Sequence, residues 1–186
     1  MNRQAGLVCF LLVFFAGFVH SSIAQTRSMV KPCIADGPSL KETVEYINRN
    51  MADSKSPTYD DQGKRYIEVN ASEYKVSFFS GREQVSSHVK YLTCETEAVV
   101  DGKGYDPPMH YVSLWCKQQY PGCFSGQRWN GANRDLKDTS QSGISFYYLA
   151  EDMDERLARA LSHLVVLLQQ MYKSDPANVT DPFAPK

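Results

Sequence analysis

The chain has 186 residues, of which 42% are hydrophobic, 12% aromatic and 22% charged, and its formal net charge at pH 7 is -1. This length is enough for one domain with a modest core. The near-neutral balance provides no basic field for nucleic acid or for an anionic membrane surface, so we expect neither as a partner.

The N-terminus has the pattern of a secretory signal peptide. Arg3 gives a short positive start, residues 7–18 form an apolar run, and small residues follow at Ser22 and Ala24. This order of segments predicts export to the periplasm or the cell exterior, with cleavage after Ala24. The apolar run is shorter than the roughly 20 residues that a membrane-spanning helix needs. We therefore expect no stable membrane insertion after cleavage.

Cleavage leaves four cysteines, which are Cys33, Cys94, Cys116 and Cys123. An even number of cysteines in an exported chain predicts two disulfides. Of the three possible pairings we favour Cys116–Cys123, which closes the loop CKQQYPGC, and Cys33–Cys94, which ties the N-terminal segment to the strands. A zinc site is not expected, because there is no C-x-x-C pair and no histidine at ligand spacing. A catalytic thiol is equally disfavoured in an oxidising compartment.

Residues 37–51 (GPSLKETVEYINRNM) predict the first helix. Ser39 is the expected N-cap residue, and Glu42 stands three positions later, which is the spacing of a capping box. One face of this helix is apolar and carries Leu40, Val44, Ile47 and Met51.

The middle of the chain predicts β-strands. Tyr74, Val76 and Phe78 alternate with polar residues, which is the period of a strand with one buried face. Aromatic and β-branched residues predict the other strands. The expected strands are 65–69, 73–79, 88–94, 110–116 and 143–149. Asn130-Gly131 is the strongest signal for a two-residue hairpin turn.

Residues 149–170 (LAEDMDERLARALSHLVVLLQQ) predict a long closing helix. Its start carries four carboxylates, which are Glu151, Asp152, Asp154 and Glu155. Acidic residues in a first turn favour the positive end of the helix dipole, and Asp152 with Glu155 has the spacing of a capping box. We therefore interpret this cluster as helix capping rather than as an acid–base pair or a cation site.

The apolar residues of the closing helix extend beyond one face. A core-facing stripe contains Leu157, Leu161, Leu164, Val165 and Leu168. His163 falls on the opposite, polar face, which Val166 and Leu167 interrupt. This extra apolar surface predicts a second covering element, the helix that starts at Ser39, or an interface with another chain. A membrane-surface helix is disfavoured, because it would carry many Lys and Arg residues and would need no acidic start.

Strands that run together with a helix at each end predict an α+β fold. We expect an N-terminal helix, a bent antiparallel sheet of about six or seven strands in meander order, and a long C-terminal helix packed on the sheet. This order of elements resembles a pleckstrin-homology-like roll. We assign residues 1–24 to the signal peptide, 25–174 to one domain and 175–186 to a Pro-rich flexible tail.

The segments 38–47 (PSLKETVEYI) and 155–168 (ERLARALSHLVVLL), with DPF at 181–183, carry a family resemblance. They resemble a group of uncharacterised bacterial exported proteins that pair a Pro-Ser-Leu-x-Glu-Thr opening helix with an Ala- and Leu-rich closing helix. This sequence departs from the group in lacking a Cys and Gly pair after the closing helix. The resemblance implies a small exported α+β domain of unknown activity, and it supplies no catalytic residues.

No catalytic constellation stands out in the sequence. The chain has neither a G-x-S-x-G nucleophile elbow nor a glycine-rich phosphate loop. His88 and His110 each open an expected strand, but no carboxylate stands at the spacing of a third metal ligand. We expect no metal and no cofactor.

An exposed hairpin provides the one candidate binding site. An aromatic ring, an amide and two guanidinium groups suit a sugar or a peptide, and the residues are Arg128, Trp129, Asn130 and Arg134. We therefore expect a non-enzymatic exported domain that binds an unknown protein or envelope component. The alternatives are a small cell-envelope hydrolase whose site is assembled from distant residues, and a carbohydrate-binding module that uses Trp129.

Overall fold

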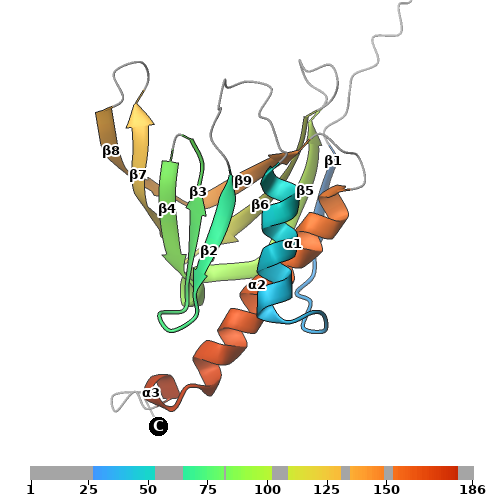
Figure 1. The fold of residues 1–186 in the computed structure, drawn as a ribbon, viewed down its shortest axis with the longest axis vertical. Helices are drawn as coiled ribbons and strands as arrows, with labels where there is room; N and C mark the ends of the chain where they lie inside the picture. Colours follow the sequence, from blue (N-terminus) through green and yellow to red (C-terminus); the bar gives the residue numbers. More distant parts are fainter. Residues whose placement is uncertain are drawn as a thin grey trace, which may run out of the picture.

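Two antiparallel sheets and a long C-terminal helix form the framework of the protein in the computed structural model (Figure 1). The structure describes residues 27–52, 65–81, 83–101, 109–130, 135–148 and 153–179. The strands are β1 (Arg27–Lys31), β2 (Tyr66–Asn70), β3 (Lys75–Phe79), β4 (Glu83–His88), β5 (Leu92–Asp101), β6 (Met109–Cys116), β7 (Phe124–Asn130), β8 (Asp135–Gln141) and β9 (Gly143–Tyr148). The helices are α1 (Leu40–Ala52), the 3-10 helix η1 (Val89–Tyr91), α2 (Met153–Ser174) and α3 (Pro176–Val179).

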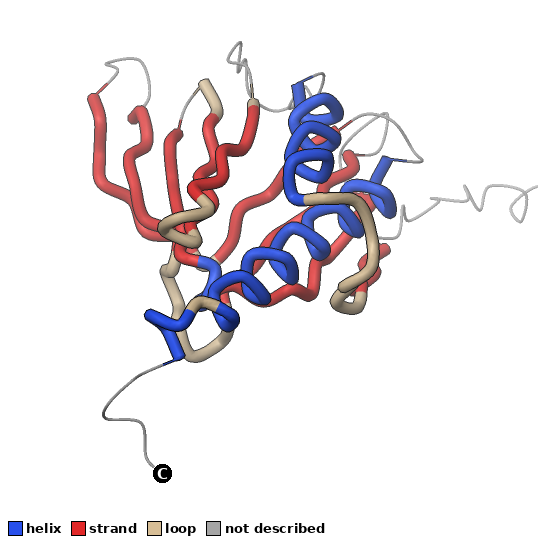
Figure 2. The backbone as a smooth tube through the Cα atoms, turned by 60° about the horizontal axis from the view of Figure 1, so that its bottom comes forward, coloured by secondary structure: helices blue, strands red, loops and turns tan. Residues whose placement is uncertain are grey.

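The strand order within the sheets does not follow the chain. One sheet has the order β1-β5-β6-β9 and the other has the order β2-β3-β4-β7-β8. Apart from the connection through α1, the chain therefore changes sheet between β4 and β5, between β6 and β7, and between β8 and β9. Figures 1 and 2 show α2 lying across the four-stranded sheet, while the five-stranded sheet rises at one side of the helix.

These three changes of sheet lie side by side and form a corner of the structure. The Cys116 amide donates to the Ser142 carbonyl oxygen at 2.8 Å, which joins the end of β6 to the junction between β8 and β9. The Lys117 amide donates to the Tyr91 carbonyl oxygen at 2.8 Å, which joins the same strand end to η1. We call this region, residues 89–92, 116–123 and 142, the corner.

Gly122 allows the loop between β6 and β7 to turn within the corner. Its φ of +74° is in the left-handed region that favours glycine, and a Cβ at this position would lie 2.4 Å from the Ser140 hydroxyl oxygen. The Gly122 amide donates to Ser142 Oγ at 3.0 Å, and its carbonyl oxygen accepts from the Ser140 hydroxyl at 2.9 Å. A side chain here would therefore displace the loop from β8.

The core lies between the two sheets and α2. Its largest fully buried side chains are Phe124, Phe146, Ile47, Met51, Ile67, Leu92, Leu114, Ile144, Leu157, Leu161, Leu164 and Leu168. The alternation predicted for β3 is confirmed, since Val76 and Phe78 are buried and Lys75 is exposed. A buried hydrogen bond from the Thr96 hydroxyl of β5 to the Ala158 carbonyl oxygen, at 2.9 Å, fixes α2 on the four-stranded sheet.

The capping box predicted for the first helix is confirmed. The Ser39 amide and hydroxyl donate to the Glu42 carboxylate at 2.9 and 2.7 Å, and the Glu42 amide approaches Ser39 Oγ at 3.4 Å. The hydrogen bonds from Ser39 hold the pKa of Glu42 below its usual value of 4.5. On another side of the helix, Asn48 donates to the Ile67 carbonyl oxygen at 2.9 Å and accepts from the Ile67 amide at 2.7 Å. Asn48 thus pairs with β2 at the edge of its sheet, where a neighbouring strand would otherwise bond.

Residues 32–38, which we call the strap, connect β1 to α1 and lie along α2 (Figure 2). The Ser162 hydroxyl of α2 lies 3.2 Å from both the Pro32 carbonyl oxygen, to which it donates, and the Ile34 amide, from which it accepts. The next residue of the helix, His163, has its ring nitrogens 3.1 Å from the Ile34 carbonyl oxygen and 2.8 Å from that of Pro38.

The strap explains why the placement of His163 on a polar helix face was wrong. Only 3% of the His163 surface is exposed, because the strap covers this side of α2. A Cβ on Gly37 would come within 2.9 Å of the His163 ring, so the backbone fits closely over the imidazole. Val166 and Leu167 are half-buried, and α1 packs against α2, as the extra apolar surface predicted.

Both favoured disulfides are present. The Cα atoms of Cys33 and Cys94 are 5.2 Å apart, and those of Cys116 and Cys123 are 5.8 Å apart. The first disulfide ties the strap to β5, and the second closes the corner loop. The two cross-links are compatible with an oxidising environment.

The predicted α+β fold is confirmed, with a helix before the sheets and a long C-terminal helix packed on them. The described residues hold two strands that were not expected, β1 and β4. Part of the expected strand 88–94 is η1, because the chain changes sheet there. The meander order was wrong, since β4 pairs with β7 and β6 pairs with β9. The likeness to a pleckstrin-homology-like roll stays a comparison of element order.

The two-residue turn predicted at Asn130-Gly131 was also wrong, although the hairpin itself is present. Asn130 pairs with Asp135, so the connection consists of the four residues 131–134. The signal peptide, Glu151, Asp152 and the chain beyond Val179 lie outside the described residues. Glu155 is described, and its carboxylate pairs with Arg159 one helical turn later at 3.5 Å.

We predict that His163→Ala lowers the free energy of unfolding by about 2 kcal/mol, because it removes the hydrogen bond from the buried ring to the strap and opens a cavity beneath it. Chemical denaturation of the oxidised protein measures this change. Arg159→Ala, an exposed position on the same helix, is the matched control and should cost no more than about 0.5 kcal/mol. Equal losses in the two variants would contradict the role of the strap.

Candidate functional site

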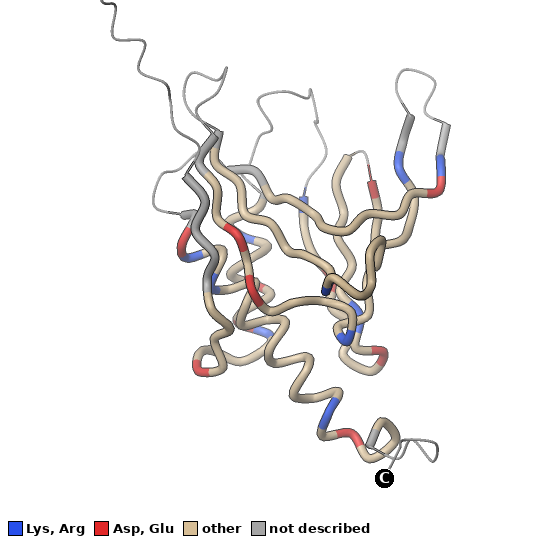
Figure 3. The backbone as a smooth tube through the Cα atoms, turned by 180° about the vertical axis from the view of Figure 1, so that it is seen from behind, with Lys and Arg blue, Asp and Glu red and all other residues tan. Residues whose placement is uncertain are grey.

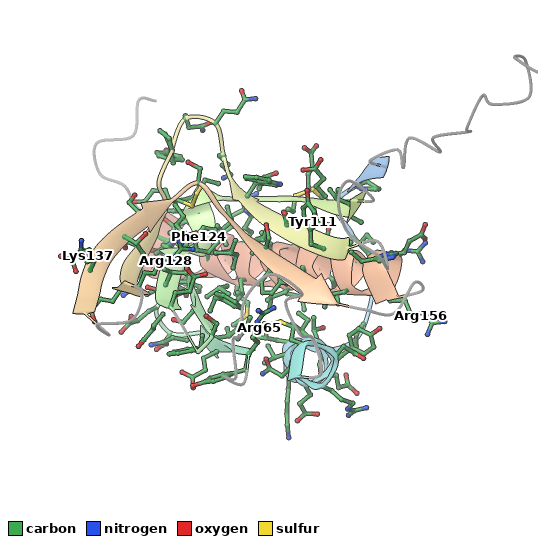
Figure 4. All side chains as sticks on the ribbon, turned by 90° about the horizontal axis from the view of Figure 1, so that it is seen from above. Arg65, Tyr111, Phe124, Arg128, Lys137 and Arg156 are labelled. Carbon is green, nitrogen blue, oxygen red and sulfur yellow. A yellow bond between two sulfur atoms is a disulfide. The ribbon has the colours of Figure 1, made fainter. Side chains whose placement is uncertain are left out.

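Of the four residues of the predicted hairpin site, the structure describes the side chain of Arg128. This side chain forms an ion pair. Arg128 of β7 donates through Nε and Nη2 to the Glu83 carboxylate, both at 3.0 Å. Gln141 of β8 donates to the same carboxylate oxygen at 3.0 Å. Figure 4 shows Arg128 at the end of the molecule that β7 and β8 form. Arg128 therefore belongs to a polar cluster that joins β4, β7 and β8.

The other hairpin residues cannot be placed in a site. The backbones of Trp129 and Asn130 lie in β7, but their side chains lie outside the described part of the structure, as does all of Arg134. A sugar or peptide site at Trp129 stays a prediction.

The two strand histidines do not form a pair. His110 opens β6 in the four-stranded sheet and is 7% exposed, whereas His88 ends β4 in the five-stranded sheet. His88 was expected to open a strand, and instead it caps η1. Within the described ranges, no group of three or more His, Cys, Asp or Glu side chains is arranged to hold a metal ion.

A partly exposed row of aromatic rings passes over the corner. The ring centroids are 4.8 Å apart for Tyr91 and Tyr120, 5.9 Å for His88 and Tyr91, 5.1 Å for His88 and Tyr172, and 5.3 Å for Tyr74 and Tyr172. We call these rings and the lysine beside them the corner strip, which consists of Tyr74, Tyr172, His88, Lys90, Tyr91 and Tyr120. Tyr120, at one end of the row, is 42% exposed.

The strip is assembled from four segments that are far apart in the chain. They are the turn before β3, the end of β4 with η1, the disulfide loop after β6 and the last turns of α2. The Val89 amide donates to the Tyr74 carbonyl oxygen at 2.8 Å, and the Lys117 amide donates to that of Tyr91 at 2.8 Å. These backbone hydrogen bonds hold the turn, η1 and the loop together, so the rings have fixed neighbours.

Tyr74 is held in a conformation that costs free energy. Its φ of 52° lies in the left-handed region, which costs a non-glycine residue about 1 kcal/mol or more. Its hydroxyl donates to the Asp175 carboxylate. This hydrogen bond lowers the pKa of Asp175 and raises that of Tyr74. Asp175 was assigned to the flexible tail, and its contact with Tyr74 attaches the end of α2 to the five-stranded sheet.

His88 contributes a neutral ring to the strip. Its Nδ1 accepts a hydrogen bond from the Lys90 amide at 3.1 Å, so the ring proton is on Nε2. Burial lowers the pKa of His88 below its usual value of 6.5, and the positive charges of Lys90 and Lys75 lower it further. The imidazole is therefore uncharged at neutral pH, while the field around it is positive.

Lys90, one source of this positive field, and Lys117 bring two ammonium groups to the strip. The Lys90 ammonium lies 4.9 Å from the centroid of the Tyr91 ring, a cation–π contact, and the Lys117 ammonium donates to the Lys90 carbonyl oxygen at 2.7 Å. Among the described residues, neither lysine pairs with a carboxylate, whereas Lys75 pairs with Glu73 at 2.7 Å. Figure 3 shows basic positions gathered where the two sheets meet.

The strip has the chemistry of non-covalent recognition. Two carboxylates lie beside Tyr74, and the pKa values of both, Glu73 and Asp175, are below the usual range, because Lys75 and Tyr74 donate hydrogen bonds to them. A general acid at neutral pH needs a raised pKa, which neither carboxylate has. Rings, hydroxyl groups and ammonium groups instead offer stacking, hydrogen bonds and charge.

No local pattern in the sequence marks the strip. Tyr91 was assigned to a strand, Tyr120 to a disulfide loop and Tyr172 followed the predicted helix stripe. The useful signals were the eleven tyrosines of the chain and the disulfide that fixes one of them near the strands. Which tyrosines meet depends on the order of the strands, and this order was predicted wrongly.

No family model, curated protein or solved structure matches the chain. The resemblance to uncharacterised exported proteins therefore stays a prediction. None of the described helices is long and apolar enough to cross a membrane.

We predict that lowering the pH below 6.5 destabilises the protein through His88. Its pKa is lower when folded, so the unfolded chain binds more protons in the window just below 6.5. The stability linked to His88 is complete above that value and is lost as the pH falls through the window. Denaturation curves between pH 7.5 and 5 measure how the free energy of unfolding changes with pH. NMR titration of His88 measures its pKa.

His88→Asn is the matched variant for this measurement. Its amide oxygen replaces Nδ1 as the acceptor for the Lys90 amide, but it does not titrate. Below pH 6.5, the free energy of unfolding of the variant should fall less steeply with decreasing pH than that of the wild type. An unchanged slope, or a His88 pKa above 6.5, would contradict the burial and positive field described for this ring.

Proposed function

We propose that the protein is an exported, non-enzymatic binding domain and that the corner strip is the surface that contacts its ligand. The observation that carries this proposal is the gathering of five rings from four distant segments at a surface that also carries two lysines without carboxylate partners among the described residues. Aromatic residues and ammonium groups that converge on a rigid surface are typical of binding sites.

The rigidity of the strip supports the proposal. Its rings are fixed by backbone hydrogen bonds at the corner, by the Cys116–Cys123 disulfide and by the contact of Tyr74 with Asp175. Fixed groups lose little entropy when a ligand binds, which increases affinity. The left-handed conformation of Tyr74 adds to this argument, because such strained residues concentrate at functional sites.

Export is supported by the N-terminal sequence pattern and the two disulfides. The order of a positive start, an apolar run and small residues is that of a signal peptide, and the disulfide pairs are compatible with an oxidising compartment. We assign the mature protein to the periplasm or the cell exterior, with an envelope component or a protein as its partner.

We predict that a bacterial host exports the full chain and releases a mature protein that starts at Gln25. Intact mass of the exported fraction and peptide mapping without reductant should find this N-terminus and both disulfides. Ala24→Glu should slow cleavage, because signal peptidase needs a small residue there. A full-length chain with free thiols in the cytoplasm would contradict export.

We predict that mature protein co-sediments with cell-envelope fragments and that the strip is responsible. The double variant Tyr120→Ala, Lys90→Glu should bind at least about tenfold more weakly, because it removes one exposed ring and reverses one charge. The apparent Kd from a sedimentation titration measures the effect.

The matched control is Tyr66→Ala, Lys41→Glu. Tyr66 is half-buried and stacks on Phe79 at 4.7 Å, and Lys41 is an exposed residue of α1, so this variant makes the same chemical changes away from the strip. The control should bind like the wild type. Equal weakening of the two variants, or no binding by the wild type, would refute a ligand contact at the strip.

A further inference from the structure

We propose that the ligand of the corner strip is an acidic polysaccharide, a chain of sugar rings that carries carboxylate or sulfate groups. This inference rests on the proposed function and names the ligand class of the same surface. It differs from the sugar site predicted at Trp129, which lies in the β7–β8 hairpin.

The row of rings suits an extended chain rather than a single small molecule. Contacts run from Tyr120 through Tyr91 to His88, with centroid spacings of 4.8 and 5.9 Å. They end in a group of three rings, His88, Tyr172 and Tyr74, whose centroids are 5.1, 5.3 and 6.2 Å apart. The rings therefore offer several contact points across the strip. A polysaccharide presents hydroxyl groups and C–H faces at regular intervals, so it can bond to tyrosine hydroxyls and pack one sugar face against the exposed Tyr120 ring.

The charges select an anionic chain. Lys90 and Lys117 bring two ammonium groups to the middle of the row. The Lys90 ammonium lies over the Tyr91 ring, and the Lys117 ammonium donates a hydrogen bond to the Lys90 carbonyl oxygen. The described structure pairs neither of them with a carboxylate. An incoming carboxylate or sulfate would bind these two ammonium groups without breaking an existing ion pair, so the free-energy cost of rearranging the site is small.

The hydroxyl groups favour a sugar over a membrane surface. Four of the five rings are tyrosines, which present a polar group as well as an apolar face. A membrane-surface site would instead expose Leu, Phe and Trp side chains. Across the described residues, the large apolar side chains that are exposed are Trp115, Tyr120 and Met171. They do not form the continuous aliphatic face that insertion into lipid requires.

The ring geometry favours a sugar over a single-stranded nucleic acid. Base stacking needs open and parallel ring faces. In the strip, the pairs of His88 with Tyr172 and of Tyr74 with Tyr172 have interplanar angles of 88° and 77°, so a ring edge covers a neighbouring ring face. The Tyr74 hydroxyl is used by Asp175, and the hydroxyls of the other three tyrosines remain for a ligand rich in hydroxyl groups.

The test measures binding of the mature, oxidised protein to four probes by isothermal titration calorimetry at low salt. Alginate carries carboxylates, heparin carries sulfates, dextran is a neutral polysaccharide, and oligo-dT is an anionic chain without sugar hydroxyl faces of this kind. We expect alginate or heparin to bind and dextran and oligo-dT to bind at least tenfold more weakly. Which acidic chain binds identifies the anionic group.

Two single variants separate the contributions of ring and charge. Tyr120→Ala should weaken acidic-glycan binding about tenfold at every salt concentration, because it removes an exposed ring. Lys90→Glu should weaken it strongly at low salt, and the slope of log Kd against log salt should fall by about one or more. Lys41→Glu on α1 makes the same charge change away from the strip and should leave both values unchanged.

Three results would overturn the inference. The first is a preference for oligo-dT or for phosphatidylglycerol vesicles over both acidic polysaccharides. The second is polysaccharide binding that Tyr120→Ala and Lys90→Glu leave unchanged. The third is no polysaccharide binding at all. If envelope binding still depends on the strip in any of these cases, only the ligand class is wrong and the proposed function stands.

Discussion

The structure depends on the corner where the chain changes from one sheet to the other. Two backbone hydrogen bonds, from Cys116 to Ser142 and from Lys117 to Tyr91, hold three separate changes of sheet together. Each of them pairs a backbone amide with a carbonyl oxygen at a point where a strand leaves its sheet. The sheets can therefore face a common core, and the loops that the corner requires carry the rings of the strip.

The second constraint is the position of α2 between the four-stranded sheet and the elements that cover it. Thr96 fixes the helix to β5, while Ser162 and His163 hold the strap on the opposite side. A helix covered on two sides needs apolar or hydrogen-bonded residues over most of its surface. This requirement explains both the half-buried Val166 and Leu167 and the buried histidine.

The sequence predicted those features that depend on neighbouring residues. Ser39 and Glu42 gave the start of α1, the alternation from Tyr74 to Phe78 gave β3, and the stripe of leucines gave α2. The pairing of the cysteines was also predicted from the sequence, because Cys116 and Cys123 flank a short loop and Cys33–Cys94 joins the N-terminal segment to the strands. These are local rules of capping and periodicity, so they hold whatever the strand order is.

The sequence did not predict features that depend on contacts between distant segments. The polar strand β4 gave no alternation signal, and without it the order of the five-stranded sheet was wrong. The sequence placed His163 by helical period alone, which does not show that the strap crosses that face. The same reason applies to the candidate site: Tyr91 and Tyr120 are 29 positions apart in the chain and meet only because β6 ends beside η1.

The place of α2 in the chain has a consequence for the order of folding. Leu157, Leu161 and Leu164 belong to the core, and Ser162 and His163 bond residues about 130 positions earlier. A chain that emerges N-terminus first shows its strands and strap before the helix that covers them. The core therefore cannot close until nearly the whole chain has been synthesised, and until then it exposes apolar strand faces that must be kept from aggregating.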